Sequence, residues 1–222
     1  MPIIVHHLNN SRSQRVLWLL EEINAPYEIK YYQRTKAGLA PEELKAVHPL
    51  GKSPVVVADG HVLAETGAII EYLIDHQSDG RLRPPAETEA RLRYNFWMHY
   101  AEGSAMPPLL MKLIFQTMPR RSPTLLRPLV RQIAAKALTG FVDPQLSLHL
   151  GYWEQTLGQS AWFAGEDFSA ADIMMSFPVE AAAARSGALG GRPKLAGFLQ
   201  RIHARAAYQR ALARGGPYEL LR

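Results

Sequence analysis

The feature that most constrains this chain is a proline placed directly before a run of three valines, Pro54 before residues 55–57. Proline has no N–H to donate to a sheet ladder, so it fits the first position of a strand or a constrained turn. A second apolar run follows after a short polar turn and ends in Glu65 and Thr66, just before a helical pattern over 67–73. A strand, a turn, a strand and a polar pair at a helix start form an arrangement typical of an anion site.

The composition is that of a globular chain with a sizeable core. Its 222 residues are 47% hydrophobic and 20% charged, and no apolar run approaches the roughly 20 residues that a membrane-spanning helix needs. The first residues lack a basic segment followed by a long apolar one, so no secretory signal is visible. We therefore expect a cytoplasmic protein.

The chain contains no cysteine. Disulfides, thiolate metal sites and a cysteine nucleophile are therefore excluded, and any thiol chemistry must use a thiol from outside. The net charge of +5 comes from scattered Lys and Arg, with Arg120 and Arg121 adjacent and a loose series over 201–214. This pattern favours an ordinary solvated surface, attractive to small anions, over a nucleic-acid interface.

Periodicity predicts a small βαβαββα unit followed by helices. The first unit has strands at 3–8 and 27–32, helices at 13–23 and 41–47, the two strands around the turn at 58–60, and a helix ending near 76. Turn-forming residues over 77–85 indicate a linker, which we place at 79–86 between domains of 1–78 and 87–222. The second domain is predicted to be all-helical, with helices over 86–118 (bent or broken at Pro107 and Pro108), 129–157 (interrupted near Gly140 and Pro144), 171–186 and 195–214, and a proline-rich break over 119–128.

This order of elements, with a proline before the third strand, resembles the soluble glutathione transferases over essentially the whole chain. The resemblance implies a thioredoxin-like N-terminal domain, an all-helical C-terminal domain and a homodimer. In that family the proline is cis, and the next residue pairs through its backbone with the cysteinyl part of glutathione. The matching residues here are Pro54 and Val55.

The resemblance also implies the remaining glutathione contacts. An acid and a hydroxyl residue hold the γ-glutamyl end, which carries over to Glu65 and Thr66, while Lys52 stands where a basic or amide side chain meets the glycine carboxylate; Ser53 completes the set. A carboxylate suits the ammonium of the tripeptide, and a hydroxyl with helix-start amides suits a carboxylate. The alternative is that Pro54 ends a loop and that Glu65 and Thr66 merely cap a helix.

The family activates the glutathione thiol with a tyrosine, serine or cysteine after the first strand. Residues 9–15 contain neither Tyr nor Cys, so the chain resembles the serine-type members, and particularly a bacterial and fungal branch. Ser11 stands four residues before Arg15, as in theta- and delta-like classes, and Ser13 is the alternative; either serine can instead be a plain N-cap. Arg12 is a weaker candidate for added positive potential.

A hydroxyl donor meets the chemical need, because an unperturbed thiol has a pKa near 8.5 and the thiolate is the nucleophile. Lowering that pKa by about two units takes roughly 2.7 kcal/mol. One hydrogen bond to a charged acceptor gives about 1.5 to 3 kcal/mol, and a helix N-terminus up to about 1 kcal/mol. No metal or organic cofactor is required beyond glutathione as co-substrate.

Two further predictions concern the helical domain. Ser169 and Asp172 have the spacing of a helix capping box and resemble the family's structural one. An apolar pocket for the electrophile is expected between the domains, shaped or covered by residues 107–128. Its candidate residues are Leu8, Trp97, Tyr100, Ser104 and Met106.

The function that these expectations imply is conjugation of glutathione to hydrophobic electrophiles, as in detoxification, with reduction of organic hydroperoxides as a further activity. The alternative is a non-catalytic glutathione-binding or regulatory protein on the same fold. Glutaredoxin-like chemistry is excluded, because it needs an enzyme cysteine.

Overall fold

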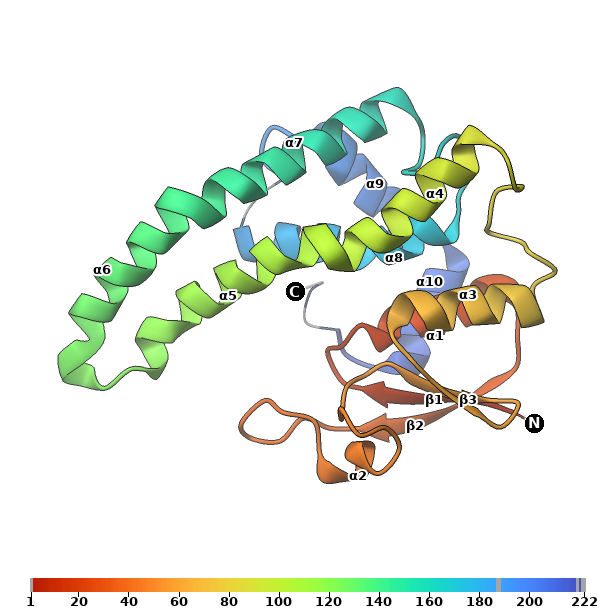
Figure 1. Ribbon diagram of the computed structural model, residues 1–222, viewed down its shortest axis with the longest axis horizontal. Helices are drawn as coiled ribbons and strands as arrows, with labels where there is room; N and C mark the ends of the chain where they lie inside the picture. The colour runs from red at the N-terminus through yellow and green to blue at the C-terminus, as the bar shows by residue number, and fades with distance from the viewer. Residues whose placement is uncertain (1, 187–188, 219, 221–222) are drawn as a thin grey trace.

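The computed structural model describes residues 2–186, 189–218 and 220, and it has the thioredoxin-like and all-helical parts that the sequence predicts (Figure 1). A four-stranded sheet in the order β2-β1-β3-β4 forms the first part. Strand β1 is parallel to β2 and antiparallel to β3, and β3 is antiparallel to β4. The elements of this part are β1 (Ile3–Leu8), α1 (Ser13–Ile23), β2 (Tyr27–Tyr32), α2 (Glu42–Lys45), β3 (Val55–Ala58), β4 (His61–Ala64) and α3 (Thr66–Gln77).

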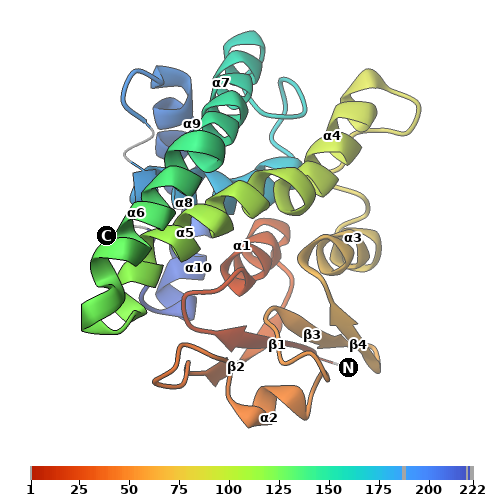
Figure 2. The same cartoon turned by 60° about the vertical axis from the view of Figure 1, so that its left-hand side comes forward.

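The sheet is covered on both faces. Helices α1 and α3 lie on one face and the single turn α2 on the other, as Figure 2 shows. Side chains alternate along a strand, so Ile3 and Val5 of β1 join the main core while Leu8 packs in a small second cluster beside α2. Because both faces of β1 are buried, its sequence does not alternate between apolar residues facing the core and polar residues facing solvent.

The second part contains two long helical arms that run side by side (Figure 1). Its elements are α4 (Glu89–Tyr100), η1 (Ala101–Ala105), α5 (Met106–Arg121), η2 (Thr124–Leu126), α6 (Arg127–Ala137), η3 (Leu138–Val142), α7 (Asp143–Gln159), α8 (Ala170–Ser186), α9 (Pro193–His203) and α10 (Ala206–Gly215). The interruption predicted near Gly140 and Pro144 is the π-helical turn η3.

Three details differ from the predicted helices. Pro107 and Pro108 do not break their helix, because they occupy the first turn of α5, where no N–H is needed, directly after the π-helical turn η1. Helix α5 continues through Pro119 to Arg121, and α6 begins at Arg127, so the connection between them is shorter than the break predicted over 119–128. The predicted helix over 195–214 is two helices, since Arg205 adopts extended backbone angles between them.

Ion pairs join the linker to α3 of the first part, and others join residues at the start of and within α10 to α1. Arg83 of the linker forms ion pairs with Glu71, at 2.8 Å, and with Asp75. Arg205 and Arg210, from the loosely basic series, pair with Glu22 and Glu21 of α1 at 2.9 and 2.7 Å. These arginines thus serve the contact between the two parts of the chain. No described helix has the length and apolar character needed to cross a membrane.

The capping pair at α8 is present in modified form. Asp172 accepts from the Ser169 N–H at 2.9 Å and from its hydroxyl at 3.2 Å, and also from the Phe163 N–H at 2.9 Å. Complete burial raises the pKa of Asp172 to about 7, although these hydrogen bonds act in the opposite direction. The carboxylate therefore joins the loop before α8 to the helix start.

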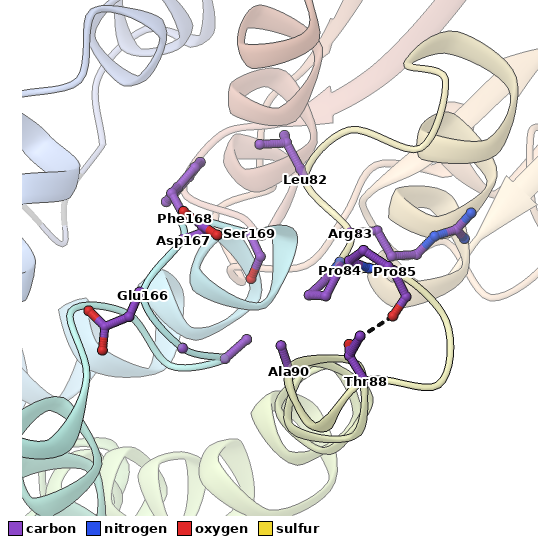
Figure 3. Close-up of a pocket in the computed structure, with 12 residues that line it drawn as sticks. Leu82, Arg83, Pro84, Pro85, Thr88, Ala90, Glu166, Asp167, Phe168 and Ser169 are labelled. Carbon is purple, nitrogen blue, oxygen red and sulfur yellow. Dashed lines mark hydrogen bonds between the residues drawn. The ribbon is translucent and has the colours of Figure 1, made fainter.

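Beside this loop lies a cavity of about 300 Å³ (Figure 3). Its walls are the linker, including Leu82 and Pro85, and residues 164–169, and the Thr88 hydroxyl donates to the Pro85 carbonyl at 2.8 Å across one side. Within the described chain, none of the residues predicted to bind glutathione lies on this cavity.

Candidate active site

A cavity of about 210 Å³ lies where β3, the start of α3 and η1 meet. Five of the six predicted glutathione-binding residues line it, namely Lys52, Ser53, Pro54, Glu65 and Thr66. The sixth, Val55, is buried in β3, where it pairs with His6 and Ala64. The Ser53–Pro54 peptide is cis, as the resemblance implies. The fold therefore brings residues 52–54 and residues 65–66, which are more than ten positions apart in the sequence, to one cavity.

Two groups on this cavity are in states that a folded protein normally avoids. Glu65 has φ of 68°, a left-handed angle that is uncommon for residues other than glycine. The buried Nδ1 of His48 has no hydrogen-bond partner among the described residues. Backbone outliers and unpaired buried polar atoms are concentrated at functional sites.

An ion network around the buried Arg15 lies beside the cavity, and its members Arg12 and Glu102 line it. Arg15 of α1 is completely buried, donates to the Met174 carbonyl at 2.8 Å and to the Thr66 hydroxyl at 3.4 Å, and pairs with Glu102. Arg12 also pairs with Glu102, at 2.8 Å. Burial by itself raises the pKa of Glu102, but Arg15 and Arg12 outweigh it, so this pKa lies below its ordinary value.

Sequence reasoning did not find Glu102. This residue lies in η1, where the π-helical turn brings a carboxylate onto the cavity wall. In the sequence Glu102 is a single acidic residue a few positions before Pro107 and Pro108. This pattern does not reveal that a π-helical turn changes the direction in which its side chain points.

The two candidate serines lie together but differ in access. Ser11 is 6% exposed and lines a larger cleft of about 820 Å³, whereas Ser13 is 0% exposed. Their hydroxyl oxygens are 2.7 Å apart, and Ser11 is also within 3.2 Å of the Ser53 hydroxyl. The larger cleft shares Arg12, Lys52 and Ser53 with the smaller cavity. A ligand can therefore extend from Glu65 to Ser11.

The candidate electrophile residues separate into two groups. Leu8 and Met106 line the larger cleft, but in the described chain Trp97, Tyr100 and Ser104 are on neither of the two cavities. Trp97 is 1% exposed and packs on Phe163, and Tyr100 accepts from Trp153 Nε1 at 3.0 Å. The cleft wall comes instead from α5 and α8, through Leu110, Leu113, Arg121 and Phe177. Helix α5 thus shapes the cleft, as predicted for the segment 107–128.

The arrangement favours an anion at the Ser11 position. Ser11 stands two residues before α1, whose N-terminus carries partial positive charge. Arg12 lines both cavities and Lys52 lies beside them. A small anionic nucleophile held here faces an apolar wall, which is the geometry of a reaction between a charged and a hydrophobic molecule.

Comparison with known proteins agrees with this site. The N-terminal domain model of the glutathione S-transferases matches residues 2–75, and their C-terminal domain model matches residues 117–206. The chain is 40% identical to glutathione S-transferase 3 of Schizosaccharomyces pombe over 81% of this chain and 74% of that protein. It is 31% identical to glutathione S-transferase 1 of Saccharomyces cerevisiae over 94% and 93% of the two chains.

A solved structure gives the same result in three dimensions. A glutathione S-transferase from Actinobacillus pleuropneumoniae superposes with a TM-score of 0.81 at 30% identity, covering 99% of this chain and 96% of the other. The fold, the two family models and the full-length relatives lead to one assignment: this chain belongs to the glutathione S-transferase family.

Proposed function

We propose that this protein is a serine-type glutathione transferase, which conjugates the glutathione thiolate to hydrophobic electrophiles. The observation that carries the proposal is the meeting of the two cavities, one lined by Lys52, Pro54 and Glu65 and the other by Ser11. Glutathione is an extended tripeptide of about 10 Å, with charged groups at both ends, and the shared lining lets one ligand occupy both cavities.

The binding roles follow from charge. Glu65 accepts the ammonium of the γ-glutamyl group, and the Thr66 hydroxyl with the first amides of α3 holds its carboxylate. Lys52 neutralises the glycine carboxylate at the other end.

Val55, to which the resemblance assigns the cysteinyl part, is already paired with His6 and Ala64 inside the sheet. The strand entry at Ser53 and Pro54, which lines the cavity, therefore offers the backbone groups for this part of the tripeptide.

The reaction needs an ionised thiol next to an apolar wall. Ser11 donates a hydrogen bond to the sulfur and thereby favours the thiolate. The sulfur electron pair then forms the bond to the electrophilic carbon, whose leaving group departs with the electrons of the broken bond. No metal or organic cofactor enters this chemistry, and an organic hydroperoxide is a second class of electrophile, attacked at oxygen.

Calorimetry and kinetics with single variants test the assignment. Ser11→Ala should reduce kcat/KM for an activated aryl chloride by up to about 25-fold near pH 7, because a thiol pKa that returns from about 6.5 to about 8.5 lowers the thiolate fraction from about 0.76 to about 0.03. Its Kd for glutathione should remain within about twofold, since the charged ends carry the binding. Glu65→Gln should instead weaken glutathione binding, with Glu89→Gln, an exposed glutamate of α4, as the control.

The serine mechanism is wrong if Ser11→Ala and Ser13→Ala both leave turnover intact. The non-catalytic alternative is not favoured by the family relatives, and an absence of turnover together with tight glutathione binding would restore it. As further parts of the proposal, we assign the domains to 1–78 and 87–222 with a linker at 79–86, the assembly to a homodimer and the location to the cytoplasm. The second range includes the few residues outside the described part of the chain.

A further inference from the structure

The positive charge of this chain is concentrated on the helical hairpin that α5 and α6 form. Residues 103–142 contain six Lys and Arg and no Asp or Glu. The whole chain has 25 Lys and Arg and 20 Asp and Glu, which leaves 19 basic and 20 acidic residues outside this segment. The excess of positive charge therefore belongs to one hairpin, on the residues Lys112, Arg120, Arg121, Arg127, Arg131 and Lys136.

Five of these six cations face solvent. Lys112 pairs with Asp143 at 2.9 Å. Among the residues that the structure describes, none of the other five takes part in an ion pair, and all five are exposed. Arg127 donates through Nε to the Ser122 carbonyl at 3.2 Å, which holds it at the turn between the helices. The hairpin thus carries a positive potential that its own residues do not compensate.

The same hairpin ends in apolar side chains that are open to solvent. Leu125 of η2 is 94% exposed, and Leu126, Leu129 and Ile133 are 51% to 57% exposed. The last three follow helical spacing and share one stripe. Ala134 is the single buried residue of η2 and α6. An apolar surface of this kind on the outside of a folded chain marks an interaction site.

The hairpin tip, residues 120–133, lies at one end of the longest axis of the molecule (Figure 1). Leu125 stands at its turn, between Arg121 at the end of α5 and Arg127 at the start of α6. Arg131 follows one turn behind Arg127, about 6 Å along the helix. The tip therefore presents apolar groups at its end and cations beside and behind them. Arginine side chains suit this order, because their stems lie along apolar surface while the charged heads stay in a polar layer.

We propose that the hairpin tip docks on the surface of a lipid bilayer that contains anionic lipids. Such a surface has phosphates outside and acyl chains below them, which is the order in which the tip presents its cations and leucines. The leucines enter the boundary between headgroups and acyl chains, and the guanidinium groups bind the lipid phosphates. The docking is peripheral, since the tip enters the bilayer surface from one side.

Two other occupants fit the hairpin tip less well. A second copy of this chain would bring the same cations against each other, which is repulsive. An acidic protein would match the charge, but it would need a pocket shaped for a projecting turn with Leu125 at its end. A lipid surface is fluid and needs no such pocket. Charge and shape together therefore favour the bilayer.

Co-sedimentation of the full chain with vesicles tests the docking. Vesicles of equal parts phosphatidylcholine and phosphatidylglycerol offer anionic phosphates, and vesicles of phosphatidylcholine alone are the neutral reference. We expect binding to the mixed vesicles that weakens as salt is added, and no measurable binding to the neutral ones. Equal binding to both kinds overturns the proposal. Absence of binding to the mixed vesicles also overturns it and would favour an acidic protein as the occupant.

Paired charge variants test whether the hairpin tip makes the contact. Each cation close to an anionic surface contributes about a fivefold change in binding, so Arg127→Gln with Arg131→Gln should weaken binding to the mixed vesicles about 25-fold. Lys30→Gln with Lys194→Gln removes the same charge from exposed positions on β2 and α9, and should change binding by less than about twofold. Equal losses in the two pairs would mean that net charge alone matters, and would overturn docking through the tip.

Paired leucine variants test the apolar part of the contact. Leu125→Ser with Leu126→Ser should weaken binding to the mixed vesicles at least about tenfold, because apolar side chains no longer leave water on docking. Leu92→Ser with Leu148→Ser is the control, at positions 71% and 68% exposed on α4 and α7. If the tip pair binds as the wild type does, the contact lies elsewhere and the proposal is wrong. If the tip pair instead converts a dimer into monomers in lipid-free ultracentrifugation, the tip joins two copies and the proposal is also wrong.

The absence of cysteine from the sequence allows a single label at the tip. Leu125→Cys carrying a polarity-sensitive fluorophore should emit at shorter wavelength when mixed vesicles are added, and the same label at Leu92→Cys should not. A label at position 125 that stays in water while the protein sediments with the vesicles would overturn insertion of the tip. These assays use no glutathione, so their outcome is independent of the proposed function.

Discussion

Replacement of Glu102 by glutamine tests whether the ion network is the main link between η1 and α1. The change removes the carboxylate that faces Arg15 and Arg12. A buried cation that loses its partner costs about 3 to 5 kcal/mol. Glu102 is 31% exposed, and Arg15 keeps its bond to the Met174 carbonyl, so we expect about 2 to 3 kcal/mol. For a chain of this size the melting temperature should fall by about 4 to 12 °C.

The pH dependence of this loss has a definite sign. The pKa of Glu102 in the folded protein lies below its ordinary value of 4.5. The carboxylate therefore contributes its full stabilisation above about pH 4.5, and the contribution disappears as the pH falls through the lower, folded pKa. Thermal melts of wild type and Glu102→Gln should differ by a constant amount from about pH 7 to 5 and converge at lower pH.

The control is an exposed ion pair. Glu42 and Lys45 are 2.7 Å apart, with side chains 82% and 51% exposed, so Glu42→Gln should change the stability by no more than about 0.5 kcal/mol. If Glu102→Gln were as stable as Glu42→Gln, the buried Arg15 would not depend on this carboxylate and the reasoning would be refuted.

Three further measurements test the packing. Gly215→Ala should lose about 1 to 3 kcal/mol in urea unfolding, because a Cβ there would lie 2.7 Å from a side-chain oxygen of α1, whereas Gly158→Ala, with nothing within 4 Å, should gain up to about 1 kcal/mol. Asp172→Asn should lower the free energy of unfolding by about 2 to 3 kcal/mol, because the amide N–H₂ group would face the N–H and hydroxyl donors that now bond to the carboxylate. The yield of refolded protein should fall more than the turnover of the folded fraction. Leu113→Ala should raise the electrophile KM and leave the glutathione KM unchanged, while Trp97→Phe should lower the melting temperature without changing either KM; the opposite pattern would place the electrophile on α4.

The sequence was sufficient where the information is local. The order of elements, the strand entry at Pro54 and the polar pair at Glu65 and Thr66 follow from spacing along a short segment, and the structure confirms the fold class. Ser11 and Ser13 could not be separated from the sequence, because both stand at the same helix start. Their different exposures arise from the surrounding elements.

The electrophile wall could not be derived from helical periodicity. The π-helical turn η1 inserts residues into the helix between α4 and α5 and changes the face that each presents. Trp97 is consequently in the core while Met106 faces the cleft.

The ion pairs between α10 and α1 have a consequence for synthesis of the chain. Helix α1 leaves the ribosome well before α10, because their paired residues Glu22 and Arg205 are 183 positions apart in the sequence. Tyr208 of α10 covers Trp18 of α1, with ring centroids 5.0 Å apart. Domains generally fold in order of emergence, but here the outer face of α1 stays uncovered until α10 has also emerged. The nascent N-terminal part therefore exposes this apolar surface while the intervening helices are made, and α10 covers it.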